Sequence, residues 1–300
     1  MNKLTPYRGR FAPSPSGELH FGSLIAAVAS YLQARSSNGE WLIRIEDIDE
    51  NRTVKQSDLH ILRTLEQFGF EWDSEVIYQS QRKKLYQDYL DVLIEQDLIF
   101  ACECSRNQLR QHAEKHGQTL AYPGTCRNRQ LSIQKPYALR CRISDQKLSF
   151  TDQIQGKLTV NLARDCGDFI VKRRDGFFAY QLVVVIDDAE QGITDIVRGA
   201  DLLDSTPQQI YLQQCLILPR LTYAHLPIAM HNNGKKLSKS HQDLAVRHQS
   251  QGQILSSVLD YLEQSPPTDL ALNSIADIWT WAIENWDLRK IKAVEEIIIK

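Results

Sequence analysis

The sequence predicts an α/β fold in which a parallel sheet with crossover helices is interrupted by a largely antiparallel insertion. Strand and helix patterns alternate over the first hundred residues, which is typical of βαβ units. Residues 100–180 then become polar, with Cys, His, Gly and Pro, before an apolar run resumes at 182–186. The 300 residues, of which 42% are hydrophobic and 24% charged, suffice to bury a large core.

The elements of the first part follow from local pattern. Tyr7–Phe11 reads as a short strand, and a helix is expected from about Ser23, a plausible N-cap, because apolar residues then recur at the helical period. Alternation predicts a second strand over Trp41–Glu46. Two further helices are expected over Asp58–Phe68 and from Ser80.

The insertion is expected to be rich in antiparallel pairs. Tyr137–Ile143 alternates like a strand, and two short runs flank Asp175-Gly176, a dipeptide that favours a tight hairpin turn. The continuous apolar run Leu182–Ile186 then predicts a buried parallel strand that returns the chain to the first sheet.

The last part of the sequence is helical in pattern, with a break at Pro266-Pro267. An apolar stripe that includes Trp279 and Trp286 is interpreted as core packing in preference to a base-stacking platform. Together these changes divide the chain into a first half of the parallel sheet, an insertion, a second half and a short helical tail, over residues 1–99, 100–180, 181–245 and 246–300.

Composition limits the classes of function. The formal net charge is −2, so a nucleic-acid partner would need a local basic surface rather than a global field. The N-terminus lacks the apolar segment of a secretory signal, and no apolar run approaches the ~18 residues of a membrane span. Six cysteines in such a chain do not indicate a disulfide framework. A cytoplasmic protein without membrane contact is therefore expected.

Two distant segments together predict a nucleotide site. The loop after the first strand is stiffened by prolines, and Gly22 lets a ligand approach the backbone at a helix start that can face a phosphate. Because ligands bind at the carboxyl ends of parallel strands, Arg10, His20 and Glu46 should surround one crevice. The lysines of Lys236-Leu-Ser-Lys-Ser240 could close over a phosphate and stabilise charge in a transition state. Each segment alone would be a weak signal.

Three cysteines close in sequence indicate a metal site. Cys102 and Cys104, with Cys126 from a nearby loop, can occupy three corners of a tetrahedral zinc site. His112 and His116 are chemically ordinary fourth ligands, and reduced structural cysteines are the alternative interpretation. A closed site of this kind would fold the insertion rather than perform chemistry.

The two distant segments resemble the paired signature motifs of class I aminoacyl-tRNA synthetases. Arg10–Gly17, Arg44–Asp49 and Val197–Asp201 are similar to the glutamyl-tRNA synthetase branch, and the resemblance covers most of residues 7–245. It implies a Rossmann-like catalytic domain with a zinc-containing mixed insertion and a short helical C-terminal region. It also implies ATP-dependent formation of glutamyl-adenylate, with Mg²⁺ accompanying ATP. One departure is Ser23, which stands where the general motif ends in histidine.

The resemblance implies roles for individual residues. Catalytic roles would fall to His20, Lys236 and Lys239. The ATP site would comprise His20, Gly22, Ser23 and Lys239. The glutamate site would comprise Arg10, Phe11, Ala12, Pro13, Ser14, Glu46, Tyr180 and Arg198.

The chemistry of glutamate suggests how such a pocket would divide its charges. Arg10 and Arg198 are candidates for the two substrate carboxylates, with Ser14 as a further donor, and Glu46 is the candidate for the ammonium group. The alternative for Glu46 is a surface ion pair with Arg44 or Arg52. Since glutamine lacks the side-chain charge, specificity for glutamate is expected.

The Cys-x-Cys…Tyr-x₃-Cys pattern and the 60 residues after Ser240 resemble the glutamyl-queuosine tRNA(Asp) synthetase family. In that family Tyr122 would be the fourth zinc ligand, and the short tail would replace a large anticodon-binding region. The resemblance implies transfer of glutamate to queuosine at the wobble position of tRNA(Asp), by a monomer whose partners are ATP, L-glutamate and the anticodon stem-loop. The alternatives are a truncated glutamyl-tRNA synthetase that charges a tRNA 3′ end and a non-catalytic regulatory module.

A basic run offers a candidate contact with the RNA. Lys172, Arg173 and Arg174 could bind phosphates of the stem-loop. An exposed charge run on a hairpin is the equally supported alternative.

Overall fold

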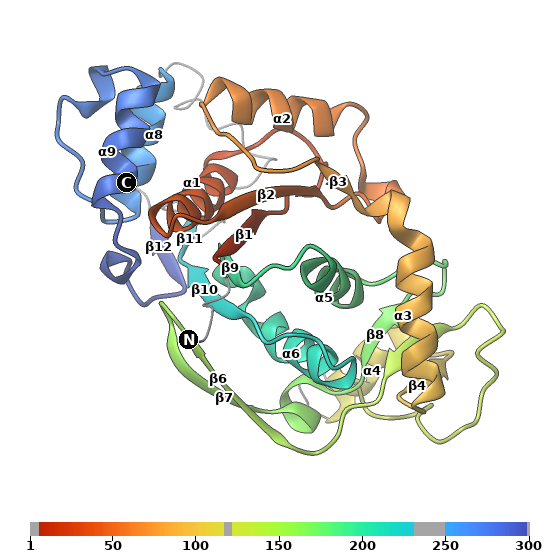
Figure 1. Ribbon diagram of the computed structural model, residues 1–300. Coiled ribbons are helices and arrows are strands. Elements are labelled where there is room, and N and C mark those ends of the chain that lie inside the picture. Colours follow the sequence, from red (N-terminus) through yellow and green to blue (C-terminus); the bar gives the residue numbers. More distant parts are fainter. Residues whose placement is uncertain (1–5, 117–121, 231–249, 299–300) are drawn as a thin grey trace, which may run out of the picture.

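The computed structural model describes residues 6–116, 122–230 and 250–298. A parallel sheet and a mixed sheet, which contains a parallel pair, meet at its centre (Figure 1). The first has the order β1 (Arg8–Phe11), β2 (Glu40–Ile45), β3 (Ile77–Tyr78), and the second pairs β9 (Asp195–Gly199) with β10 (Thr222–Leu226). The two halves join where the Thr194 N–H donates to the Arg8 carbonyl oxygen at 2.9 Å, beside the contact of β1 with β9. The predicted parallel α/β arrangement is confirmed.

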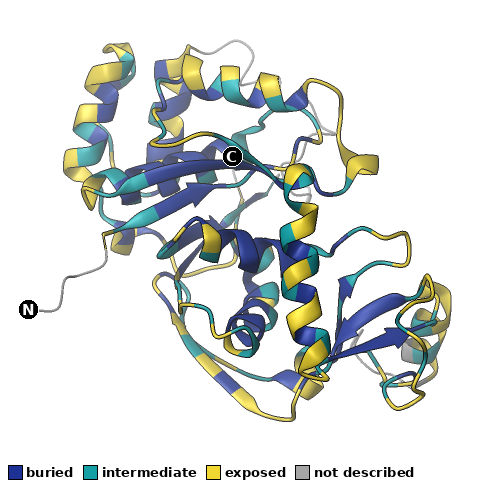
Figure 2. Cartoon of the chain, turned by 45° about the vertical axis from the view of Figure 1, so that its right-hand side comes forward, coloured by how far each residue is buried: buried dark blue, intermediate teal, exposed yellow. Residues whose placement is uncertain are grey.

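Helices connect and cover these strands. Longer helices of the two halves are α1 (Phe21–Ser36), α2 (Ser57–Gln67), α3 (Lys83–Glu95), α5 (Tyr180–Glu190) and α6 (Thr206–Cys215). Short helical segments are η1 (Glu50–Arg52), η2 (Gln79–Arg82), η3 (Leu162–Cys166), η4 (Ala200–Ser205), η5 (Leu270–Leu272) and η6 (Leu288–Lys290). The amphipathic α3, upright at the centre of Figure 2, turns one face to solvent and buries Tyr86, Leu90 and Leu93.

The apolar run Leu182–Ile186 is not a strand, contrary to the prediction. It lies in α5, where every residue from Leu182 to Asp188 is buried. A helix buried all round shows no polar face, so its sequence cannot be distinguished from a buried strand by periodicity. The strand that returns to the parallel sheet is β9, and Tyr180 begins the helix instead of ending a hairpin arm.

The insertion is antiparallel, as predicted. β4 (Ile99–Cys102), β5 (Ala138–Cys141) and β8 (Phe169–Lys172) form one sheet, and α4 (Arg106–His116) follows β4. β6 (Lys147–Asp152) and β7 (Gly156–Asn161) form a hairpin, and Asp152 at the end of β6 pairs in parallel with Tyr223 near the start of β10. The turn at Asp175-Gly176 is confirmed, although its second arm is reduced to one bridge at Phe178.

The tail packs on the first half. α8 (Gln251–Tyr261) and α9 (Ile275–Asn285) contact α1, and β12 (Glu296–Ile298) pairs in parallel with β11 (Ile228–Met230), so the tail is not wholly helical as predicted. Trp279 is buried between Tyr31 and Phe70, with ring centroids 4.8 and 4.9 Å away. Its role in core packing is therefore confirmed. The boundaries of the four parts of the chain stay a prediction.

The search for membrane-spanning segments covered the described residues. None of their helices combines the length and the apolar character that crossing a bilayer requires.

Two glycines allow a matched test of packing at the end of α2. Gly69 (φ +73°) and Gly176 (φ +90°) both adopt the left-handed conformation. A Cβ on Gly69 would lie 2.7 Å from Ile275 Cγ2, whereas one on Gly176 would meet nothing within 4 Å. Alanine at either position should cost about 1–2 kcal/mol for backbone strain, and Gly69→Ala should cost about 1–3 kcal/mol more through overpacking. Urea unfolding of both variants measures the difference, and equal losses would contradict the packing argument.

Candidate active site

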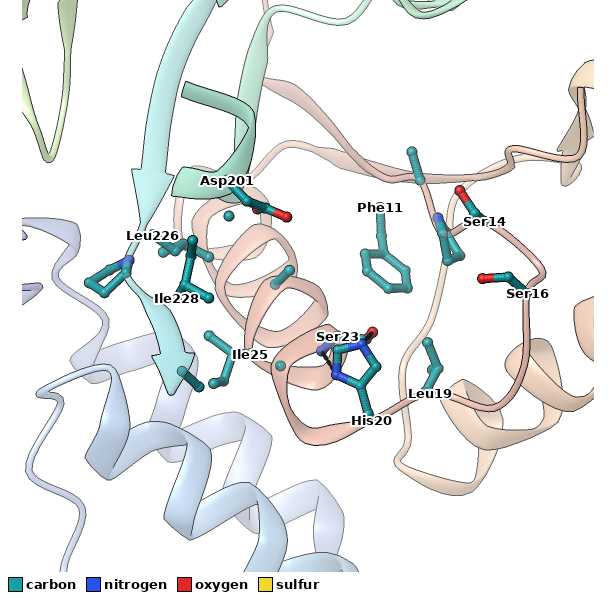
Figure 3. A pocket seen from close by; sticks show the side chains of 17 residues that line it. Phe11, Ser14, Ser16, Leu19, His20, Ser23, Ile25, Asp201, Leu226 and Ile228 are labelled. Carbon is teal, nitrogen blue, oxygen red and sulfur yellow. Dashed lines mark hydrogen bonds between the residues drawn. The ribbon is translucent and has the colours of Figure 1, made fainter. Parts of the chain in front are cut away.

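A cavity of about 300 Å³ opens beside the N-terminus of α1 (Figure 3). One wall comes from β1, the loop after it and the first turns of α1. The other comes from the ends of β9 and β10 and the chain that follows them. Figure 3 shows His20 and Ser23 together at the start of α1, with Asp201 and Leu226 on the second wall. The cavity therefore lies at the carboxyl ends of parallel strands, as expected for a ligand site.

The loop between β1 and α1 is held in shape by its neighbours. The Glu46 N–H donates to the Pro13 carbonyl oxygen at 3.0 Å, and the Val54 N–H donates to the Pro15 carbonyl oxygen at 2.8 Å. Ser57 Oγ bonds both backbone groups of Gly17, at 2.6 and 2.9 Å. Prolines and these bonds together give the cavity a wall that exists without ligand.

His20, and not Ser23, caps α1, which begins at Phe21. The His20 Nδ1 accepts the Ser23 backbone N–H at 3.2 Å, and Ser23 Oγ lies 3.1 Å from His20 Nε2. An imidazole nitrogen can satisfy a first-turn N–H as a hydroxyl does. The predicted N-cap was therefore wrong, but His20, Gly22 and Ser23 do line the cavity together.

A second cavity of about 320 Å³ adjoins the first. Both are lined by Phe11, Ala12, Ser14, Ala26 and Gly199. The second cavity brings together every residue predicted for the glutamate site except Pro13, which lines the first: Arg10, Phe11, Ala12, Ser14, Glu46, Tyr180 and Arg198.

Buried charges surround this second cavity. Arg10 is paired with Asp188, its Nε 3.0 Å from Oδ1 and its Nη2 3.3 Å from Oδ2. Arg44, which is fully buried, donates to the same Asp188 at 2.8 Å and to Gln191 at 2.7 Å. Arg10 therefore lines the cavity with much of its charge already compensated by a protein carboxylate.

Glu46 is a buried carboxylate at the end of β2. Its side chain is 9% exposed, and Oε1 lies 3.5 Å from Arg44 Nη2. Burial raises the pKa of Glu46 to about 7, although the positive charges of Arg44 and Arg10 act in the opposite direction. The ion pair with Arg44 exists, but it is not the surface pair that the alternative interpretation supposed.

Arg198 reaches the second cavity from β9 and is 5% exposed. Its Nε and Nη2 donate to His225, Thr206 and Gln209, at 3.0, 2.9 and 2.8 Å respectively. Its Nη1 is buried and has no hydrogen-bond partner among the described residues. A buried guanidinium nitrogen without a partner is costly, so this group fits a bound carboxylate.

A third cavity, of about 490 Å³, adjoins the second through Ser14, Glu46 and Tyr180. Cationic side chains from three parts of the chain line it: Arg52, Arg106 and Arg173. The lining also contains Asp49, which accepts from Arg173 at 2.6 Å.

The predicted basic run is partly engaged inside the protein. Lys172 Nζ donates to Gln87 at 2.8 Å, and Arg174 Nη2 donates to the Glu103 carbonyl oxygen at 2.8 Å. Arg173 is the member of this run that lines a cavity.

The cysteine cluster is assembled as the spacing predicts. The sulfur atoms of Cys102, Cys104 and Cys126 lie within 4.8 Å of one another. Among the described residues, these three side chains form a group whose ligand atoms are close enough together to hold a metal ion. The Tyr122 hydroxyl oxygen accepts from the Cys102 thiol at 3.4 Å and from the Cys126 backbone N–H at 2.8 Å, and it lies 3.9 Å from Cys104 Sγ. Three sulfurs and one phenol oxygen are a donor set that fits tetrahedral zinc.

Sequence reasoning missed several residues of the site. Asp188 follows the run Leu182–Ile186 that was expected to be a strand, and it had no assigned role. Asp201, although part of the Val197–Asp201 motif, had none either. Leu226 and Ile228 carry no local signal for a ligand. Lys236 and Lys239 lie outside the described residues.

Comparison with known proteins identifies the family. The family model of class I tRNA synthetases (E and Q), catalytic domain, matches residues 7–259. A protein of Dechloromonas aromatica named glutamyl-Q tRNA(Asp) synthetase is 50% identical over 94% of both chains, and one of Ectopseudomonas mendocina with the same name is 47% identical over 96% of this chain and 95% of its own.

Solved structures agree with this match. A glutamate tRNA ligase from Elizabethkingia meningosepticum superposes with a TM-score of 0.81 at 26% identity, over 97% of this chain and 66% of that one. A glutamate-tRNA synthetase from Elizabethkingia anophelis gives 0.83 at 26% identity, over 99% and 68%. The chain therefore belongs to the class I tRNA synthetases (E and Q), whose catalytic domain it carries.

Proposed function

We propose that this protein activates L-glutamate with ATP and transfers the glutamyl group to queuosine at the wobble position of tRNA(Asp). The observation that carries the proposal is the close match, over more than nine-tenths of the chain, to relatives named glutamyl-Q tRNA(Asp) synthetase. The adjoining cavities support it, because they offer neighbouring places for a nucleotide and for a small, doubly charged acid.

Glutamate is assigned to the second cavity. Arg198 Nη1 and Arg10 would receive its carboxylates, and Glu46 would receive its ammonium group, while Ser14 and Tyr180 would complete the hydrogen bonding. The arginines also favour glutamate over glutamine, because a neutral amide would leave buried positive charge uncompensated.

ATP is assigned to the first cavity, with its phosphates toward the start of α1. His20, Gly22 and Ser23 line this end, where helix N–H groups favour an anion. Lys236 and Lys239 would add positive charge, and Mg²⁺ would be bound with ATP. A glutamate carboxylate oxygen then attacks the α-phosphorus, so that a P–O bond forms and pyrophosphate leaves.

The acceptor is assigned to the third cavity. It adjoins the second, so a hydroxyl that enters it approaches the activated carbonyl carbon, forms the ester and releases AMP. Its arginines suit the phosphates of a stem-loop better than a free metabolite. A truncated synthetase that charges a tRNA 3′ end is the competing function, and the acceptor experiment below separates the two.

Zinc is proposed to hold Cys102, Cys104, Cys126 and Tyr122 together. The cluster stabilises the link between β4 and the loop that carries Cys126, so its role is to fold the insertion. A monomeric state stays a prediction.

Glu46 generates a prediction about pH. Its pKa of about 7 means that the carboxylate protonates as the pH falls below 7 and then cannot attract the substrate ammonium. The KM for glutamate in ATP–pyrophosphate exchange should therefore rise by about tenfold in total as the pH is lowered from 8 to 6, because the ionised fraction of Glu46 falls from about nine-tenths to about one-tenth. Glu46→Gln should raise this KM about 10- to 100-fold at pH 8 and remove the pH dependence.

The same variant has an internal control in stability. A carboxyl whose folded pKa lies above its unfolded value destabilises the fold once it ionises, so Glu46→Gln should not lower the free energy of unfolding at pH 8. Arg44 keeps Asp188 and Gln191 as partners in that variant. An unchanged glutamate KM would refute the ammonium assignment.

The zinc proposal predicts one zinc per chain in the purified protein, measured by elemental analysis. Cys126→Ser should lose the metal and destabilise the insertion, because a structural site contributes folding energy directly. Cys166→Ser, outside the cluster, is the matched control and should retain it. A well-folded protein without zinc would argue against the site.

The acceptor is tested with two forms of one tRNA. Labelled glutamate should be incorporated into tRNA(Asp) that contains queuosine, but not into the same tRNA that lacks it. Removal of the terminal adenosine should leave incorporation intact, since the 3′ ribose is not the acceptor. Periodate, which cleaves the diol of queuosine, should abolish it. Strong charging of queuosine-free tRNA would overturn the proposed acceptor and favour the 3′ end.

A further inference from the structure

A chain of buried polar groups stands behind Arg198. Asp152 Oδ2 lies 2.6 Å from His225 Nδ1, and His225 Nε2 lies 3.0 Å from Arg198 Nε. The three residues come from β6, β10 and β9, and their exposed fractions are 1%, 0% and 5%. The proposed contacts of glutamate and ATP do not include Asp152 or His225.

The chemistry of the three groups fixes the proton positions in this chain. An arginine Nε always carries a hydrogen and donates it to His225 Nε2, so this ring nitrogen is the acceptor; the Thr206 hydroxyl, 3.1 Å from the same Nε2, can donate to it as well. The remaining ring hydrogen then lies on Nδ1 and is donated to Asp152. His225 is therefore the neutral Nδ1–H tautomer, between a carboxylate and a guanidinium.

The surroundings support this protonation state. Asp152 Oδ1 accepts backbone N–H groups of Ile154 and Gln155 at 3.0 and 2.9 Å. Although burial alone would raise the pKa of Asp152, the bonds from His225 and from these backbone groups outweigh it and hold that pKa low. Burial lowers the pKa of His225, and Arg198 acts in the same direction against the opposing effect of Asp152.

The remaining contacts of Arg198 complete its orientation. Nη2 donates to both Thr206 and Gln209, and Nε donates to His225. These three partners fix the plane of the guanidinium group. Nη1 is left buried without a hydrogen-bond partner among the described residues, in a side chain that lines the second cavity, to which glutamate is assigned.

We propose that Asp152 and His225 are positioning residues for the amino-acid substrate, which fix the Arg198 guanidinium so that Nη1 receives a glutamate carboxylate. The inference rests on the proposed function. A guanidinium already held in one orientation loses no rotamer freedom when the carboxylate binds, and misplacement would weaken binding without touching the nucleotide cavity. The β6–β7 hairpin thus supplies the anion that orients a residue of the substrate pocket.

The competing interpretation is that the pair only ties β6 to β10. If the role were purely structural, substitutions at Asp152 and His225 would lower the yield or the stability of the folded protein. They would then change the KM for glutamate and the KM for ATP to the same extent, or change neither. A positioning role changes the KM for glutamate selectively. The test therefore compares both KM values in ATP–pyrophosphate exchange and monitors the melting temperature.

His225→Ala and Asp152→Asn should raise the KM for glutamate about tenfold or more, while the KM for ATP changes less than about twofold. His225→Gln can both donate to Asp152 and accept from Arg198, so it should restore the glutamate KM to within about threefold of the original protein. Ser30→Ala is the matched control: it removes the buried bond from Trp41 Nε1 to Ser30 Oγ, at 3.0 Å, and should leave both values unchanged. If His225→Ala does not fold, Asp152→Asn and His225→Gln provide the test.

Each outcome has one meaning. If the wild-type protein catalyses glutamate-dependent exchange and the folded variants have the same KM for glutamate, the positioning role is overturned and the proposed function stands. A wild-type protein without glutamate-dependent exchange would overturn both. The tautomer is checked without any assay by ¹⁵N NMR of the imidazole ring: a bare Nε2 and a protonated Nδ1 are expected, and an Nε2–H tautomer would contradict the hydrogen-bond chain.

Discussion

The ion pairs of Asp188 with Arg10 and Arg44 hold the site together. They connect α5 with β1 and β2, so the two segments that wall the amino-acid cavity are joined beneath it. Burying three charges is expensive, and the cost is offset here by the hydrogen bonds of Asp188 to both arginines and by the bond from Arg44 to Gln191. Loss of one partner would strand a buried charge, at a cost of about 3–5 kcal/mol. The positions of Arg10, Glu46 and Tyr180 all depend on this junction.

The same network explains the electrostatic character of the cavity. Arg10 is largely compensated by Asp188, whereas Arg198 has a nitrogen without a partner among the described residues. Glu46, raised in pKa by burial, is poised to ionise fully when a cation arrives beside it. An amino acid with two carboxylates and one ammonium group would supply the missing charges. The site is therefore arranged for its ligand and is electrostatically incomplete without one.

Local signals were enough to predict much of this structure from sequence. The strand at 41–46, the helix at 58–68 and the cysteine cluster depend on short-range patterns, which the fold preserves. The helix α5 was misassigned because its residues are buried on every side, and the cap of α1 because histidine replaces the usual hydroxyl. Asp152 and His225 could not be paired from sequence, since 73 positions separate them and only the meeting of β6 with β10 joins them.

Ser14 shows how the three cavities would form one reaction path under the proposed function. It lines all of them, and Glu46 and Tyr180 line the two that would hold glutamate and the acceptor. The stiff loop around Ser14 is fixed to β2 and α2, so the point where the cavities meet cannot shift independently of the sheet. Acyl transfer requires the activated carbonyl to stay in place while pyrophosphate leaves and a hydroxyl arrives. A rigid junction between the cavities assigned to the nucleotide and to the acceptor meets that requirement, because under this assignment each partner can exchange without moving the amino acid.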